Sequence, residues 1–187
     1  METRLEAYEL LTKYNKSENL IKHGMAVEGV MKYFARKFGE NEEYWGNIGL
    51  IHDLDYELYP EEHCYKTKEI MESEGIKEDI IHAVVSHGYN ICIDVKPELK
   101  MEKVLYTIDE LTGLITAAVL MRPNKSILDL EVKSVKKKFK TSNFAAGVNR
   151  TVILSGCEML EMDLDTVILW TIEGMRENAV QLGLQGE

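Results

Sequence analysis

The chain is patterned for α-helices along almost its whole length, and this feature most constrains its fold. Apolar residues recur at three- and four-residue steps from about residue 3 to residue 182. This spacing places them on one face of a helix. Only three prolines interrupt the 187 residues, and no segment alternates apolar and polar residues long enough to predict a sheet. The sequence therefore predicts an all-α protein.

Helix boundaries follow from proline, glycine and capping residues. Gly39 and Gly88 suit the position just after a helix end, and Pro60 suits a first turn. No repeat or flexible linker divides the chain, so we expect a single domain over residues 1–187. The expected helices lie at about 3–14, 18–38, 42–52, 60–75, 77–87, 98–121, 127–140, 149–161 and 164–182, with a loop at 89–97.

Composition excludes several classes of protein. An apolar fraction of 45% is too high for intrinsic disorder. No run of 18 apolar residues predicts a membrane span, and the acidic N-terminus lacks the apolar core of a secretion signal. Cys64, Cys92 and Cys157 lie far apart and form no CxxC pair, so neither a disulfide framework nor a cysteine zinc site is expected. These features predict a cytoplasmic protein.

The charge distribution is uneven. The chain holds 22 basic and 32 acidic residues, a net charge of −10, which argues against binding a nucleic-acid polymer. Residues 131–150 nevertheless carry six bases and one acid, so this segment has a net charge of +5 and the remainder −15. The segment is either a solvated helix face or a surface that binds substrate phosphate.

The five histidines do not occupy equivalent positions. His23, His52 and His87 share stripes with apolar residues on their predicted helices, and His63 lies over the apolar face of the next helix. His82 has acidic and polar neighbours one turn away, so we expect it to be exposed. A single histidine on an apolar stripe is more often a hydrogen-bonded core residue than a metal ligand. Four of them on four helices favour a shared site.

Two acids accompany these histidines. Asp53 directly follows His52, and Asp109 lies at the edge of the apolar face of the long helix. Buried imidazoles and carboxylates require partners, and several that converge on one core can be satisfied by metal ions. Imidazole and carboxylate ligands suit one or two divalent transition metal ions, with iron, manganese, zinc, cobalt and nickel as the candidates.

The order His, His-Asp, Asp resembles the HD-domain superfamily of metal-dependent phosphohydrolases. The matching residues are His23 in LIKHGMAVEGV, His52-Asp53 in GLIHDLDYE and Asp109 in LYTIDELTG, with spacings of 29 and 56 residues. His63 and His87 extend the pattern to that of the six-ligand, two-metal branch. Over about residues 18–170 the chain is similar to small bacterial stand-alone proteins of the HDIG type.

The resemblance implies a fold and a ligand set. It implies an HD-domain helical bundle with a core at about 18–122 and a C-terminal helical extension at about 123–187. It implies a first metal at His23, His52, Asp53 and Asp109, with Asp53 bridging to a second at His63 and His87. The chain departs from the HDIG motif at Leu54-Asp55 and lacks the lysine found in some branches, which argues against a lysine-dependent mechanism.

The resemblance also implies an activity. We expect metal-activated water to hydrolyse a phosphoester or phosphoanhydride of a small phosphorylated substrate, a nucleotide by preference, with His52 and Asp53 as catalytic residues. Asp55, Glu57 and Glu110 adjoin the ligands and are candidates to orient the histidines, although Glu110 could instead face solvent. The candidate phosphate contacts, each of which could equally be ordinary surface charge, are Arg122, Lys125, Lys137, Lys138, Lys140 and Arg150.

Two alternatives stay open. Some members of the six-ligand branch are di-iron oxygenases with the same ligand order, and iron with oxygen uptake would favour that chemistry. A non-catalytic protein could instead use the metal site for structure or for sensing a ligand. The Lys-rich segment 131–150 would then bind a partner.

Overall fold

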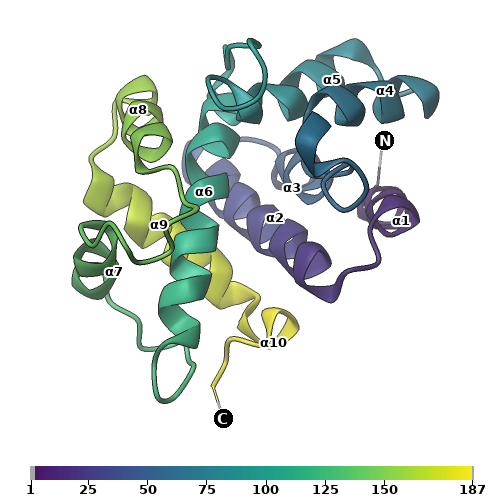
Figure 1. The fold of residues 1–187 in the computed structure, drawn as a ribbon. Helices are drawn as coiled ribbons and strands as arrows, with labels where there is room; N and C mark the ends of the chain where they lie inside the picture. The colour runs from purple at the N-terminus through teal and green to yellow at the C-terminus, as the bar shows by residue number, and fades with distance from the viewer. Residues whose placement is uncertain (1–2, 187) are drawn as a thin grey trace.

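Helices account for nearly all of the regular structure. A computed structural model describes residues 3–186, which contain ten α-helices, two short 3₁₀ helices and no strand (Figure 1). The prediction of an all-α protein is confirmed. The α-helices are α1 (Arg4–Tyr14), α2 (Glu18–Phe38), α3 (Glu42–Leu50), α4 (Tyr65–Ser73), α5 (Glu78–Val85), α6 (Lys100–Leu120), α7 (Val132–Phe139), α8 (Arg150–Leu160), α9 (Leu164–Glu177) and α10 (Ala179–Leu182). No helix in the described part of the chain is long and apolar enough to cross a membrane.

Several helices are shorter than the sequence predicts, and the shortening falls where histidines lie. The helix expected at 42–52 ends at Leu50, so His52 lies in the turn that follows. The helix expected at 60–75 begins only at Tyr65, after the 3₁₀ helix η1 (Pro60–Glu62). Cys64 has a φ of 67° at this start, which is incompatible with a continuous helix. The fifth helix likewise ends at Val85, and His87 lies in the 3₁₀ helix η2 (Ser86–Gly88).

The remaining differences concern the C-terminal third. The helix expected at 127–140 begins only at Val132, and the one expected at 164–182 is divided at Asn178 into α9 and α10. Arg176 donates hydrogen bonds to the carbonyl oxygens of Ile127 and Leu130, and the carbonyl oxygen of Ile127 also accepts from the backbone N–H of Leu130 in the turn that precedes α7.

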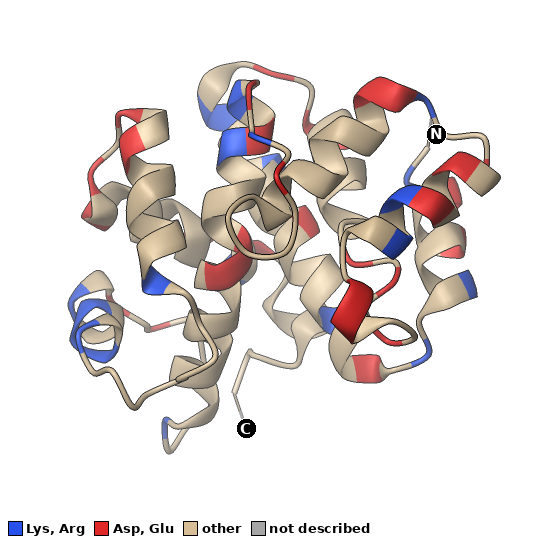
Figure 2. Ribbon diagram, turned by 45° about the horizontal axis from the view of Figure 1, so that its top comes forward, with Lys and Arg blue, Asp and Glu red and all other residues tan. Residues whose placement is uncertain are grey.

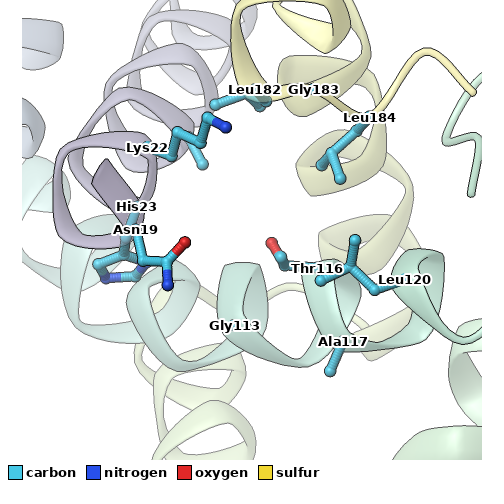
Figure 3. A pocket seen from close by; sticks show the side chains of 11 residues that line it. Asn19, Lys22, His23, Gly113, Thr116, Ala117, Leu120, Leu182, Gly183 and Leu184 are labelled. Carbon is cyan, nitrogen blue, oxygen red and sulfur yellow. The ribbon is translucent and has the colours of Figure 1, made fainter. Parts of the chain in front are cut away.

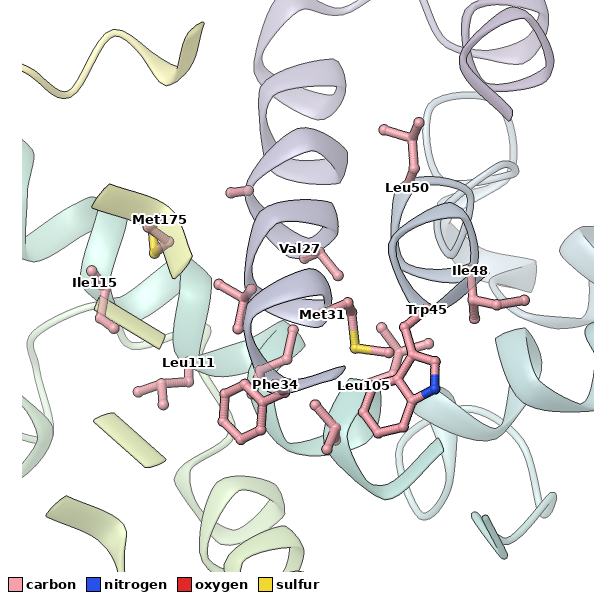
Figure 4. Close-up of a cluster of buried hydrophobic side chains, with 14 of the residues drawn as sticks. Val27, Met31, Phe34, Trp45, Ile48, Leu50, Leu105, Leu111, Ile115 and Met175 are labelled. Atoms are coloured by element: carbon pink, nitrogen blue, oxygen red, sulfur yellow. The ribbon is translucent and has the colours of Figure 1, made fainter. Parts of the chain in front are cut away.

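The core lies around α2. Val27, Met31 and Phe34 on this helix pack against Trp45 and Ile48 of α3 (Figure 4). Leu105, Leu111 and Ile115 of α6 and Met175 of α9 cover other sides of the same cluster. The helices of the predicted C-terminal extension therefore pack directly against the core and do not project away from it.

Two glycines allow α2 and α9 to approach closely. A Cβ atom placed on Gly174 would lie 2.7 Å from the Cα atom of Val30 and 3.1 Å from the carbonyl oxygen of Gly29. Both of these are backbone atoms, so they can move away only if the helices separate. The absence of a side chain at residue 174 therefore sets the distance between the two helices.

Gly174→Ala is expected to destabilise the protein by about 1–3 kcal/mol, because the added methyl group forces α2 and α9 apart. Gly113→Ala is the matched control, since a Cβ at this helical glycine would meet only Val148, at 4.0 Å. There the change is expected to stabilise the fold by about 0.5–1 kcal/mol, the usual helix preference for alanine. Urea unfolding of both variants tests the difference. Equal effects would refute the close-packing explanation.

Candidate metal centre

Six side chains converge where the middle of the bundle meets the turns around η1 and η2. His23 comes from α2 and Asp109 from α6. His52 and Asp53 come from the turn after α3, His63 from the turn after η1, and His87 from η2. Nitrogen and oxygen atoms within 4.8 Å of one another form two groups: His23, His52 and Asp109, and His52, Asp53 and His87. All six residues predicted from the sequence are therefore brought together, and their role as ligands stays a prediction.

The first side of the centre joins His23, His52 and the two carboxylates. Asp109 Oδ1 lies 2.9 Å from His23 Nε2 and 3.2 Å from His52 Nε2. Asp53 Oδ2 lies 3.3 Å from His52 Nε2 and 3.7 Å from His23 Nε2. Four potential ligand atoms thus face one small space.

The second side uses the other oxygen of the same aspartate. Asp53 Oδ1 lies 3.4 Å from His63 Nε2 and 3.5 Å from His87 Nε2. One carboxylate therefore presents one oxygen to each pair of histidines. This is the position that a bridging ligand between two ions requires.

Three of the histidine rings form a hydrogen bond on the side that points away from the centre. These hydrogen bonds determine which ring nitrogen carries the proton and which one faces the centre unprotonated. His52 Nδ1 lies 2.8 Å from the carbonyl oxygen of Gly49, and His87 Nδ1 lies 2.6 Å from that of Val84. A carbonyl oxygen can only accept, so each Nδ1 carries a proton and donates it. His63 Nδ1 donates likewise to Asp55 Oδ1 at 2.7 Å. In the neutral tautomer each Nε2 is then unprotonated, which is the form that binds metal.

The arrangement of His63 and His87 calls for a cation. Their Nε2 atoms are only 3.1 Å apart, and both lie on the unprotonated edge that the outer hydrogen bonds specify. Two lone pairs at this distance repel unless a proton or a metal ion lies between or beside them. The donor chemistry therefore fits a metal site.

The pKa values of the centre indicate the same need for positive charge. Burial alone would lower the pKa of His52, but the charges of Asp53 and Asp109 outweigh it and raise this pKa well above its ordinary value. Burial would likewise lower the pKa of His63, yet its hydrogen bond to Asp55 and the charge of Asp53 raise it to about 9. Burial would raise the pKa of Asp109, whereas the His52 and His23 rings hold it well below its usual range.

Two buried polar residues hold the His52-Asp53 turn in place. Asn15 donates through Nδ2 to the carbonyl oxygens of Asp53 and Leu54, at 3.4 and 3.2 Å. Asp55, which is fully buried, accepts from the backbone N–H of Thr67 at 2.9 Å and from His63. Asp55 therefore orients a histidine as the sequence suggested. Glu57 does not, because it accepts from the backbone N–H groups of Lys16 and Ser17.

The centre opens into a cavity of about 360 Å³. Tyr56 and Glu110 line it beside the histidines, and Glu110 also accepts from the backbone N–H of Asn149 at 2.9 Å. The sequence singled out Glu110 as a candidate either to orient a histidine or to face solvent, and it did not identify Tyr56. The one signal for Tyr56 is its position three residues after Asp53, in the turn that carries the His-Asp pair.

None of the six predicted phosphate contacts lines this cavity. None of them lines a second cavity, between α2, α6 and residues 182–184, either. Arg122 pairs with Asp129 at 2.7 Å, and Arg150 donates to a cluster of carbonyl oxygens between Phe139 and Val148. Figure 2 shows the Lys-rich helix α7 at one end of the molecule, and Lys133 and Lys137 on this helix are exposed. Lys125, Lys137, Lys138 and Lys140 belong to the same half of the chain, and their role as phosphate contacts stays a prediction.

His82 is separate from the centre. It is not simply exposed, as the sequence suggested, because 36% of its side chain is accessible and its Nδ1 lies 3.0 Å from Glu102 Oε1. Glu102 is buried and accepts from the backbone N–H groups of Glu98 and Leu99. His82 therefore contributes to the start of α6.

Two cysteines that lie 28 residues apart in the sequence meet beside the centre. The sulfur atoms of Cys64 and Cys92 are 3.3 Å apart, and with His63 they form a third group able to hold a metal. Gly88 leaves room for them, since a Cβ there would lie 2.5 Å from one sulfur and 2.6 Å from the other. The expectation that the cysteines suggest no cysteine site is thus corrected for this pair, whose proximity the sequence spacing could not show.

Comparison with curated proteins identifies ribonuclease Y as a distant relative of the chain. Over 164 residues the chain is 26% identical to ribonuclease Y of Oleidesulfovibrio alaskensis, a match that covers 82% of this chain and 30% of that protein. The chain thus corresponds to less than a third of its relative. No family profile matches the chain, and no solved structure matches it. The likeness to a ribonuclease and the His/Asp cluster are both compatible with a metal-dependent phosphohydrolase.

Proposed function

We propose that the protein is an HD-type metal-dependent phosphohydrolase that acts on a small phosphorylated substrate, a nucleotide by preference. The observation that carries this proposal is the placement of Asp53, whose two carboxylate oxygens face two separate pairs of histidines. Such an arrangement suits a two-metal centre for phosphoryl chemistry. The distant likeness to a ribonuclease supports hydrolysis of a phosphate ester.

The distances divide the candidate ligands into two groups, one for each ion. His23, His52, Asp109 and Asp53 Oδ2 would hold the first, and His63, His87 and Asp53 Oδ1 would hold the second. When bound, divalent ions supply a water of lowered pKa and neutralise charge on the phosphoryl oxygens. Nitrogen and oxygen ligands suit iron, manganese, zinc, cobalt or nickel.

The protein itself orients the histidine rings and partly encloses the centre. The backbone carbonyls of Gly49 and Val84 and the carboxylate of Asp55 each hold a ring so that its Nε2 points to the centre. These hydrogen-bond acceptors fix the orientation of the rings before the substrate binds. The site therefore needs little rearrangement during the reaction. His52 is fully buried and Asp53 only 15% exposed, so the centre is largely shielded from bulk solvent and opens into the cavity.

Loading with each candidate metal, followed by phosphate-release assays on nucleoside monophosphates, polyphosphates and simple esters, tests the proposal. We expect saturable, metal-dependent phosphate release that a chelator abolishes and that added metal restores. Oxygen consumption by the iron-loaded protein without phosphate release would instead identify an oxygenase. A bound metal with neither activity would favour a sensor, and either result would overturn the proposal.

A further inference from the structure

A second cavity adjoins the metal centre and has the character of a ligand site. It encloses about 420 Å³ between α2, α6 and the C-terminal segment 182–184 (Figure 3). Its lining shares His23 and Gly113 with the cavity of the metal centre. A substrate phosphate at the centre would therefore place the rest of the substrate at the entrance to this second space.

The passage between the two cavities follows from the sequence of two helices. On α2, Asn19 lies one turn from His23, so both reach the same face. On α6, Gly113 lies one turn after Asp109, and Thr116 follows three residues later. Each helix thus presents a candidate metal ligand and, next to it, a residue of the second cavity. Gly113 has no side chain to close the border, and a Cβ there would meet only Val148 at 4.0 Å.

Two polar side chains in this cavity, Asn19 and Thr116, are not engaged by the described part of the protein. Within residues 3–186 the side chains of Asn19 and Thr116 form no hydrogen bond, and Figure 3 shows the amide and the hydroxyl directed into the same space. Lys22 reaches in from α2 and pairs with Glu18 on the surface at 2.6 Å. Amide and hydroxyl groups can both donate and accept, so they suit a ligand edge that carries both kinds of group.

The remaining walls are apolar. Leu120 of α6 lies opposite Leu182 and Leu184, and Ala26 and Ala117 complete the lining. Apolar walls with a few convergent polar groups, at a volume of a few hundred Å³, are the usual properties of a site for a small organic molecule. A flat ring with apolar faces and an edge of hydrogen-bonding groups matches the apolar walls and the polar side chains of this cavity.

We infer that this cavity binds the organic part of the substrate, and that this part is a nucleoside. The inference rests on the proposed function for the position of the substrate phosphate. For the position of the nucleoside it rests on the properties of the cavity alone. A single nucleotide fits better than an RNA chain, because the net charge of −10 repels a polyanion and neither cavity is lined by the Lys-rich helix.

Filling the cavity tests this inference. We compare the metal-loaded protein with Thr116→Phe, which places a ring where the hydroxyl now points, and with Thr116→Val, which removes the hydroxyl and keeps the shape. Thr151→Phe, at an exposed position of α8 that lines neither cavity, is the matched control. The measured quantity is kcat/KM for the four ribonucleoside 5′-monophosphates divided by kcat/KM for methyl phosphate, which lacks a nucleoside.

Thr116→Phe should lower this ratio about tenfold or more, Thr116→Val should lower it less and change the preference among bases, and Thr151→Phe should leave it unchanged. An unchanged ratio in Thr116→Phe would overturn the inference while leaving the phosphohydrolase intact. A tenfold preference of the unaltered protein for an RNA oligonucleotide over all four mononucleotides would overturn it as well.

A binding measurement separates failure of the inference from failure of the proposed function. Calorimetric titration with the four nucleosides, which carry no phosphate, reports on the cavity even if no ester is hydrolysed. Saturable binding that Thr116→Phe weakens about tenfold or more would support the site independently of catalysis. Absence of nucleoside binding to the unaltered protein would overturn the inference whatever its hydrolytic activity.

Discussion

Asp53→Asn is expected to lower kcat/KM for phosphate release by about 10³-fold or more, equivalent to about 4 kcal/mol of transition-state stabilisation. Asparagine has the same shape as aspartate, so the turn after α3 should keep its conformation. It carries no negative charge and offers only one oxygen, whereas Asp53 presents one oxygen to each pair of histidines. The metal content of the variant should therefore fall together with its activity. Its circular dichroism spectrum should show the same helix content as that of the unaltered protein.

A matched pair of histidine variants controls for nonspecific effects. His87→Gln removes a candidate ligand whose Nε2 lies 3.5 Å from Asp53, whereas His82→Gln changes a histidine that, within residues 3–186, pairs with Glu102 and with no other acid. We expect loss of one metal ion and most activity in the first variant and neither loss in the second. Equal metal content in Asp53→Asn, His87→Gln and the unaltered protein would refute the assignment of ligands.

The metal-free protein is expected to lose stability as the pH rises from about 6 to above 9. The pKa of His63 is raised to about 9 in the folded chain, against an ordinary value of 6.5. A raised pKa contributes stability that is fully present below the unfolded pKa and is lost as the pH rises through the folded one. The shift corresponds to at most about 3 kcal/mol. Thermal unfolding in excess chelator at a series of pH values measures it.

Added metal should reverse this trend, because an ion at His63 displaces the proton. Apparent metal affinity should then rise with pH up to about 9, by up to tenfold per unit for each proton released. The difference in Tm between loaded and chelated protein should therefore widen with pH. His63→Gln removes the titrating group and should flatten both profiles. Profiles that stay unchanged in this variant would show that His63 does not govern the pH response.

The fold class and the inward-facing positions of His23 and Asp109 were predictable because both depend on helical periodicity. His23 and Asp109 lie on long helices whose apolar stripes have a single interpretation, and the bounds of α2 match the prediction. The helix ends near His52, His63 and His87 were less predictable. Turns such as the one at Cys64, with its φ of 67°, depend on tertiary contacts and leave little trace in the local sequence.

Residues whose environment depends on distant segments could not be predicted. Cys64 and Cys92 meet only because the residue before α4 lies against the loop that follows η2, and Asn19 faces Thr116 only because α2 and α6 pack together. The placement of the Lys-rich segment also depends on the fold. Its charge is visible in the sequence, but the direction in which α7 presents it is not, and Arg150 bonds to backbone carbonyls instead of a cavity.

A crystal structure of the metal-loaded protein, with anomalous scattering recorded at the absorption edge of the bound element, shows directly whether the six residues hold two ions. We expect two anomalous peaks, one among His23, His52, Asp53 and Asp109 and one among His63, His87 and Asp53, with the carboxylate of Asp53 shared. Absence of any peak at these six residues, in protein that binds metal in solution, would refute the two-metal centre.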